Sequence, residues 1–132
     1  MNLVGEPSDG QDLLQAVAQA ADRCRKPWRH GARFGGDGTS GIGDSSDCLV
    51  LVETRDVDGA RQPRLDLELE IYRSGEAVHL MVALAADEQA PLLWHGQHSV
   101  WMEARSGERV ERPADGAALE ALCRRLQAWL QT

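Results

Sequence analysis

The sequence has no apolar stretch long enough to cross a bilayer. Its longest apolar run, residues 78–86, is interrupted by His79 and is far shorter than the roughly 20 residues that a membrane helix needs. The first ten residues are acidic, and they lack the basic start and apolar centre of a secretion signal. These absences predict a cytoplasmic protein with no membrane partner.

Cysteine is scarce, and its spacing fits neither a disulfide framework nor a zinc site. Cys24, Cys48 and Cys123 are odd in number and form no CxxC pair. Each lies among apolar residues, which predicts buried thiols in a reducing compartment. We therefore expect no disulfide, no bound metal and no cofactor.

Basic residues are outnumbered by acidic ones. The 132 residues include 21 Asp plus Glu and 14 Lys plus Arg, a net charge of −7, and Lys26 is the single lysine. Such a chain is a poor match for nucleic acid, whose binding depends on a positive field. The 42% hydrophobic content is typical of a globular chain. Its length suits one domain over residues 1–132.

Common catalytic motifs are also missing. The chain has no GxSxG, no HExxH and no GxxxxGK phosphate loop. Gly36, Gly38 and Gly41 match the letters of GxGxxG, but a helix is expected before them and a strand after them. The dinucleotide fingerprint needs the opposite order. We therefore expect a protein without catalytic residues, and an enzyme is the alternative.

Helical periodicity occurs at both ends of the chain and strand periodicity in the middle. Apolar residues recur at helical spacing over residues 9–26 and 113–131. A glycine-rich loop is predicted for about 28–47, with an irregular edge strand at 32–34 as an alternative. Alternation predicts strands at 48–54, 64–73, 76–85, 99–105 and 108–112, whereas 87–94 reads as a helical turn or a crossing loop.

The fold class that follows is α+β. We expect an antiparallel sheet of about five strands, built as a three-stranded meander plus a hairpin and packed by an N-terminal and a C-terminal helix. This order of elements, over about residues 9–131, resembles that of small acidic chaperones of type III secretion, which dimerise. The resemblance covers element order, length and acidity, and it departs in the glycine-rich loop.

Two surfaces could bind a partner. Alternation places Asp66, Glu68 and Glu70 together on the polar side of one strand. In the strand at 99–105, Glu103 and Arg105 share a parity with one tryptophan, which predicts that Trp101 stands on the solvent side of the sheet. A large exposed aromatic is a contact candidate. The predicted partner-binding residues are Trp94, Trp101, Asp66, Glu68 and Glu70.

The second surface is basic. No acid occurs between Arg23 and Gly36, and an aromatic residue lies among the cations, a combination that can bind phosphate or stack on bases. The predicted anion-binding residues are Arg25, Lys26, Trp28, Arg29 and Arg33.

Together these features predict a small cytosolic interaction module: an adaptor, regulator or chaperone-like assembly factor with a protein partner, a homodimer partner, or both. Two alternatives remain open. One is a ligand-binding protein or enzyme with a pocket near Trp94, His95 and His98. The other is a nucleic-acid-binding protein that uses the basic run from Arg23 to Arg33.

Overall fold

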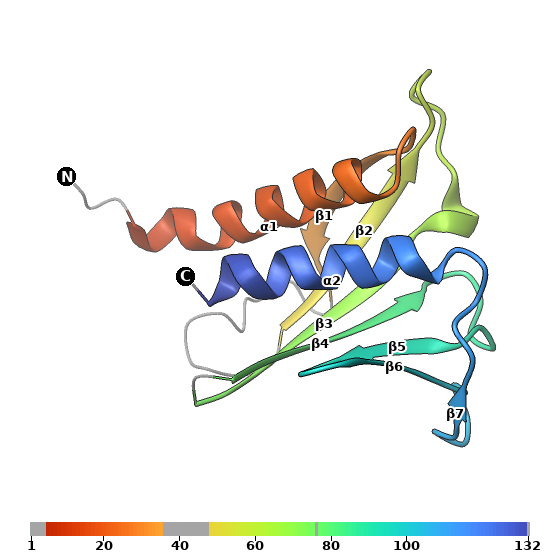
Figure 1. The fold of residues 1–132 in the computed structure, drawn as a ribbon. Helices are drawn as coiled ribbons and strands as arrows, with labels where there is room; N and C mark the ends of the chain where they lie inside the picture. Colours follow the sequence, from red (N-terminus) through yellow and green to blue (C-terminus); the bar gives the residue numbers. More distant parts are fainter. Residues whose placement is uncertain (1–4, 36–47, 76, 132) are drawn as a thin grey trace.

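A computed structural model describes residues 5–35, 48–75 and 77–131. The described residues form two α-helices, one near each end, and seven strands between them, so the fold is α+β with an antiparallel sheet (Figure 1). The elements are α1 (Gly5–Cys24), β1 (Arg29–Phe34), β2 (Cys48–Arg55), the short 3-10 helix η2 (Pro63–Leu65), β3 (Leu67–Ser74), β4 (Ala77–Leu84), β5 (Leu92–His95), β6 (Ser99–Met102), β7 (Arg109–Val110) and α2 (Gly116–Leu130).

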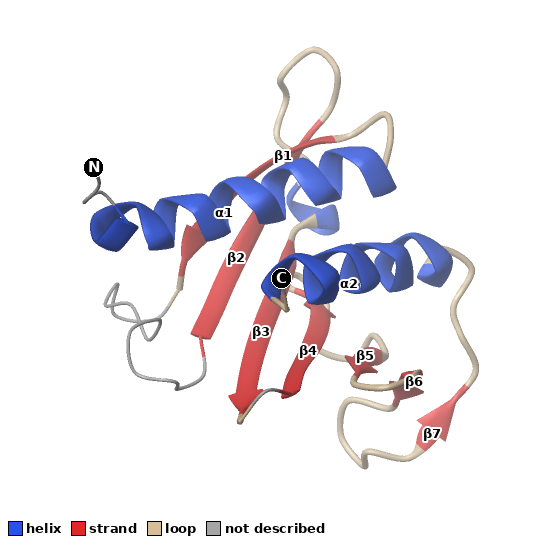
Figure 2. Cartoon of the chain, turned by 60° about the vertical axis from the view of Figure 1, so that its left-hand side comes forward, coloured by secondary structure: helices blue, strands red, loops and turns tan. Residues whose placement is uncertain are grey.

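The sheet is a meander in which every strand pairs antiparallel with the next one along the chain. Tight turns make this order possible. Gly75 and Gly107 have φ values of 63° and 75°, in the left-handed region that glycine adopts without steric cost. Both lie in the short gaps between segments that the sequence predicts as strands. Figure 2 shows that the sheet twists strongly along its width, so β5 and β6 are seen nearly end-on where β2 and β3 are seen side-on.

Both helices pack on one face of the sheet (Figures 1 and 2). The predicted helical spacing accounts for this, because it places the apolar residues of each helix on one side. Val17 of α1 and Leu122 of α2 are fully buried, as are Val50, Leu69 and Leu80 of the central strands. The core therefore lies between the two helices and the side of the sheet that faces them.

Two of the seven strands were not among the five predicted ones. β1 forms where a loop was the main expectation, and it pairs with β2 from Arg29 opposite Arg55 to Phe34 opposite Val50. β5 forms in the segment read as a helical turn or loop. Its four residues are too few to show a period of two. The rest of the glycine-rich stretch, residues 36–47, lies outside the described residues.

Two further expectations differ from the structure. α1 begins at Gly5, four residues before the start expected at Asp9. Between β4 and β5 the described residues form turns and no helix, so the helical turn expected as one alternative for 87–94 does not form. No helix in the described part of the chain is long and apolar enough to cross a membrane.

Candidate interaction surface on the open side of the sheet

The face of the sheet turned away from the helices carries a band of apolar side chains. Within the described residues no helix covers this face, which we call the open face. Strand alternation places partly exposed residues there, between the buried residues of the helix side. The apolar band consists of Leu49, Leu51, Met81, Ala83, Leu92, Trp94, Val100 and Met102.

The pairing register aligns residues of this band on β2, β4, β5 and β6 in one row that crosses β3 at a glutamate. Leu49 lies opposite Glu70, which in turn lies opposite Met81. Met81 pairs with Trp94, which pairs with Val100. Directly opposite side chains on one face lie about 5 Å apart, so neighbours along this row are in contact range. One glutamate therefore interrupts a row that is otherwise apolar.

An aromatic cluster lies at one end of the open face. The rings of His79 and Trp94 stack with centroids 5.4 Å apart and an interplanar angle of 15°, and Tyr72 lies 5.6 Å from Trp94 in a tilted arrangement. Gly96 leaves room for this stack. A Cβ added there would lie 2.6 Å from Cδ2 of His79, closer than side chains tolerate. The glycine thus permits the histidine ring to lie flat over the strand end.

Two of the three predicted acidic residues lie within the apolar band. Glu68 is exposed between Leu51 and Ala83, and Glu70 is partly exposed between Leu49 and Met81. The hydroxyl of Tyr72 donates a hydrogen bond to Glu70. None of the ion pairs found among the described residues involves Glu68. Glu68 and Glu70 are therefore two carboxylates with apolar side chains opposite them on both neighbouring strands.

Asp66, the third predicted acid, has a structural role. It precedes β3, accepts a hydrogen bond of 2.8 Å from the backbone N–H of Thr54, and pairs with Arg61 at 2.6 Å. Its carboxylate therefore fixes the connection between β2 and β3. Alternation alone could not distinguish it from its two neighbours.

The expected position of Trp101 is wrong. The residue does alternate with Val100 and Met102, but those two lie on the open face and Trp101 lies on the helix side, only 5% exposed. Its Nε1 donates a 2.8 Å hydrogen bond to Glu120 of α2. The prediction fails because β6 ends at Met102. Glu103 lies outside the strand, so its charge does not indicate which face of the sheet is exposed to solvent.

His95 and His98, the histidines of the alternative ligand pocket, occupy different environments. His98 is exposed in the connection between β5 and β6. His95 is buried, and its Nε2 lies 3.2 Å from Oε1 of Gln127 on α2. The Gln127 amide nitrogen donates 2.9 Å bonds to the carbonyls of Val78 and Gly96. Since that fixes Oε1 as an acceptor, Nε2 of His95 carries the proton and Nδ1 accepts from Ser99 at 2.9 Å.

This arrangement uses the polar groups of His95 to join α2 to the sheet. Burial lowers the pKa of His95 below its usual value, while the hydrogen bond that His95 donates to Gln127 opposes that change. The described residues contain no group of three or more His, Cys, Asp or Glu side chains placed to hold a metal. Of the two histidines, the buried His95 therefore has a structural role.

The basic run is divided by the fold. Arg25 is buried, and its guanidinium donates to Nε2 of His30 at 3.3 Å and to the Thr54 hydroxyl at 3.4 Å. Nδ1 of His30 therefore donates to Asp22 at 2.9 Å. Burial lowers the pKa of both Arg25 and His30. These groups tie the end of α1 to β1 and β2 rather than facing a ligand.

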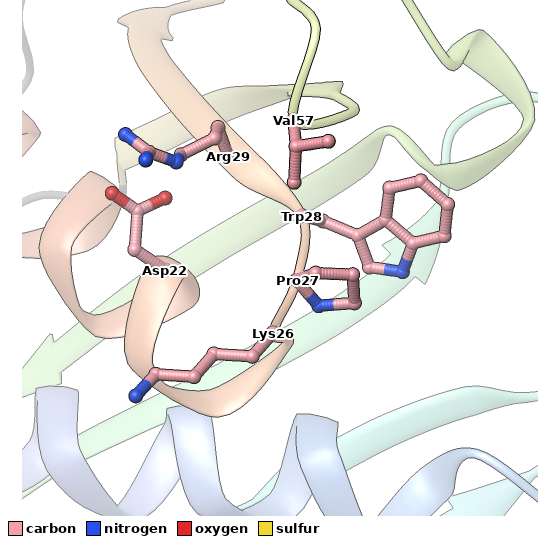
Figure 3. A pocket seen from close by; sticks show the side chains of 6 residues that line it. All are labelled: Asp22, Lys26, Pro27, Trp28, Arg29 and Val57. Carbon is pink, nitrogen blue, oxygen red and sulfur yellow. The ribbon is translucent and has the colours of Figure 1, made fainter.

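The remaining cations of the run lie apart from one another. Arg33 is on the open face and pairs with Glu53 at 3.5 Å. Lys26 and Arg29 line a shallow cavity of about 430 Å³ with Trp28 and Val57. In Figure 3 both cationic side chains extend away from the Trp28 ring, and that of Arg29 does so on the side of the Asp22 carboxylate. The described residues of the run thus do not form one continuous basic stripe.

The cysteines have free thiols in the structure. Cys48 and Cys123 are buried, and burial raises the pKa of each, that of Cys123 to about 12. A buried thiol with a raised pKa is protonated at neutral pH and is a poor nucleophile. Both therefore act as small apolar groups in the core.

A family model described as "Domain of unknown function (DUF8659)" matches residues 14–129 of this chain. The match extends from the middle of α1 to the last turn of α2, so it includes every strand of the described sheet. The chain belongs to this family. No curated protein and no solved structure gives a significant match.

Proposed function

We propose that this member of the DUF8659 family is a small non-catalytic interaction module that binds a protein partner through the open face of its sheet. One observation carries the proposal: the apolar band of eight residues lies on the face opposite both helices. Its residues are partly exposed, and the six on β4, β5 and β6 lie on adjacent strands, an apolar patch of the kind that is typical of an interaction site.

The composition of the open face supports the same function. Trp94 belongs to the band and the ring of His79 stacks against it, so the indole is held in place before any partner binds. Tryptophan is enriched among the residues that dominate binding energy at interfaces, because it buries a large area with little loss of side-chain freedom. Met81 beside it adds a side chain that adapts to the partner's shape.

The hydrogen bonds, ion pairs and burial of the other described residues give less support to the two alternatives, a ligand pocket and a nucleic-acid-binding surface. The ligand-pocket hypothesis relies on His95, whose ring nitrogens are both bonded within the fold. The nucleic-acid hypothesis relies on the basic run, in which Arg25 is buried and Arg33 is paired. A chain of net charge −7 would also repel a phosphate backbone.

Co-purification from the native host tests the proposal. The tagged wild-type protein is compared with Trp94→Ser on the open face and with Trp129→Ser on α2, where Trp129 is 43% exposed. We expect proteins captured by the wild type to be lost from Trp94→Ser and retained by Trp129→Ser. Equal capture by the wild type and Trp94→Ser would overturn the assignment of the open face.

A further inference from the structure

We infer that the partner presents a cationic side chain flanked by apolar ones, so that Lys or Arg meets Glu68 and Glu70 while apolar groups cover the band on either side. This inference rests on the proposed function and specifies the chemistry of the partner. It follows from the position of the two carboxylates and from the cost of burying them.

The carboxylates cannot be avoided by a partner that covers the band. Glu68 and Glu70 are two residues apart on β3, about 7 Å along the strand, and both point to the open face. Apolar residues flank them on both sides: Leu49 and Leu51 on β2, and Met81 and Ala83 on β4. Contact with both apolar sides therefore covers the acidic pair as well.

Covering a carboxylate with an apolar surface is strongly unfavourable unless the charge acquires a partner. Two described cations beside the open face are already engaged: Arg33 pairs with Glu53, and Arg61 pairs with Glu53 and Asp66. No ion pair within the described part of the chain satisfies Glu68. The compensating charge must therefore come from the molecule that binds.

A second copy of this chain fits the face poorly. In a two-fold dimer the same patch faces itself. Placing β3 over β3 sets Glu68 and Glu70 against the same two residues, and placing β3 over β4 sets them against Met81 and Ala83. Placing β3 over β1 would supply Arg33, but it centres the contact on β2 and leaves Trp94 outside. Charge complementarity thus favours a different, basic partner.

The experiment is a selection of random 12-residue peptides displayed on phage, performed on the wild-type protein with counter-selection on Trp94→Ser. We expect the selected peptides to be enriched in Lys or Arg next to apolar residues. A selected peptide, made synthetically, should bind at least fivefold more weakly to the Glu68→Gln, Glu70→Gln double variant. The control Glu88→Gln, an exposed acid between β4 and β5, should bind as the wild type does.

Each other outcome has a defined meaning. Peptides that depend on Trp94 but show no cationic enrichment, or that bind the double variant equally well, overturn the inference and leave the interaction surface standing. Failure to select any Trp94-dependent peptide overturns the inference, and the co-purification result then decides the proposed function separately. A dimer in solution that Trp94→Ser dissociates would show that the occupant is a second copy, contrary to the inference.

Discussion

Replacing Gln127 by methionine should destabilise the fold far more than the loss of one partly buried polar side chain would suggest. Its amide nitrogen bonds the carbonyls of Val78 and Gly96, and its oxygen accepts from His95. Methionine has nearly the same shape but satisfies none of these groups. Each buried polar group left without a partner costs about 1–3 kcal/mol. Because Gln127 is only half-buried, water can reach part of the site, so we expect a total loss of about 2–4 kcal/mol.

Urea denaturation followed by tryptophan fluorescence measures this change at pH 7.5. The matched control is Gln131→Met, an exposed position just after α2, which should stay within about 0.5 kcal/mol of the wild type. A loss below about 1 kcal/mol for Gln127→Met would refute the reasoning. It would mean that solvent replaces all three hydrogen bonds and that α2 is held to the sheet by apolar packing alone.

Three further predictions follow from other contacts. Trp101→Ala should lower the unfolding free energy by about 3–5 kcal/mol, as core Trp truncations do, and a loss under 1 kcal/mol in urea would contradict its burial against α2. Gly96→Ala should displace the His79 ring and alter the near-ultraviolet circular dichroism of the aromatic cluster, and an unchanged spectrum would show that the stack does not depend on the glycine. Stability should fall as the pH is lowered from 7.5 to 5.5. Burial lowers the pKa of His30 and His95, so the unfolded chain binds their protons first, at a pKa of about 6.5. Denaturation midpoints across this range should change less in His95→Gln, and a slope identical to that of the wild type would exclude His95 as a source.

The sequence predicts the central strands because their alternation is regular. Leu67, Leu69 and Ile71 all lie on the helix side, and Glu68 and Glu70 lie on the opposite face, as a period of two requires. Burial on one face only produces such a pattern. The two helices follow from their apolar spacing for the same reason.

The parts that could not be predicted depend on where strands end and on contacts between distant residues. β5 has only four residues, too few to show an alternating pattern. β6 ends at Met102, one residue before Glu103, whose charge predicts the wrong face for Trp101. The hydrogen bond between His95 and Gln127 joins residues 32 positions apart, and periodicity within one segment cannot predict such a contact. Trp94 likewise lies on the same face as Glu68 and Glu70 because β4 pairs with β5, which the sequence alone does not show.

Site-specific photo-crosslinking in the native host tests the interaction surface most directly. A photoreactive phenylalanine analogue is placed at Ala83, on the open face beside Glu68, or at Ala128, exposed on α2. We predict discrete covalent adducts with a protein partner from position 83 and none of the same mass from position 128. Adducts that form from position 128 and not from position 83 would contradict the claim that the open face of the sheet is the binding surface.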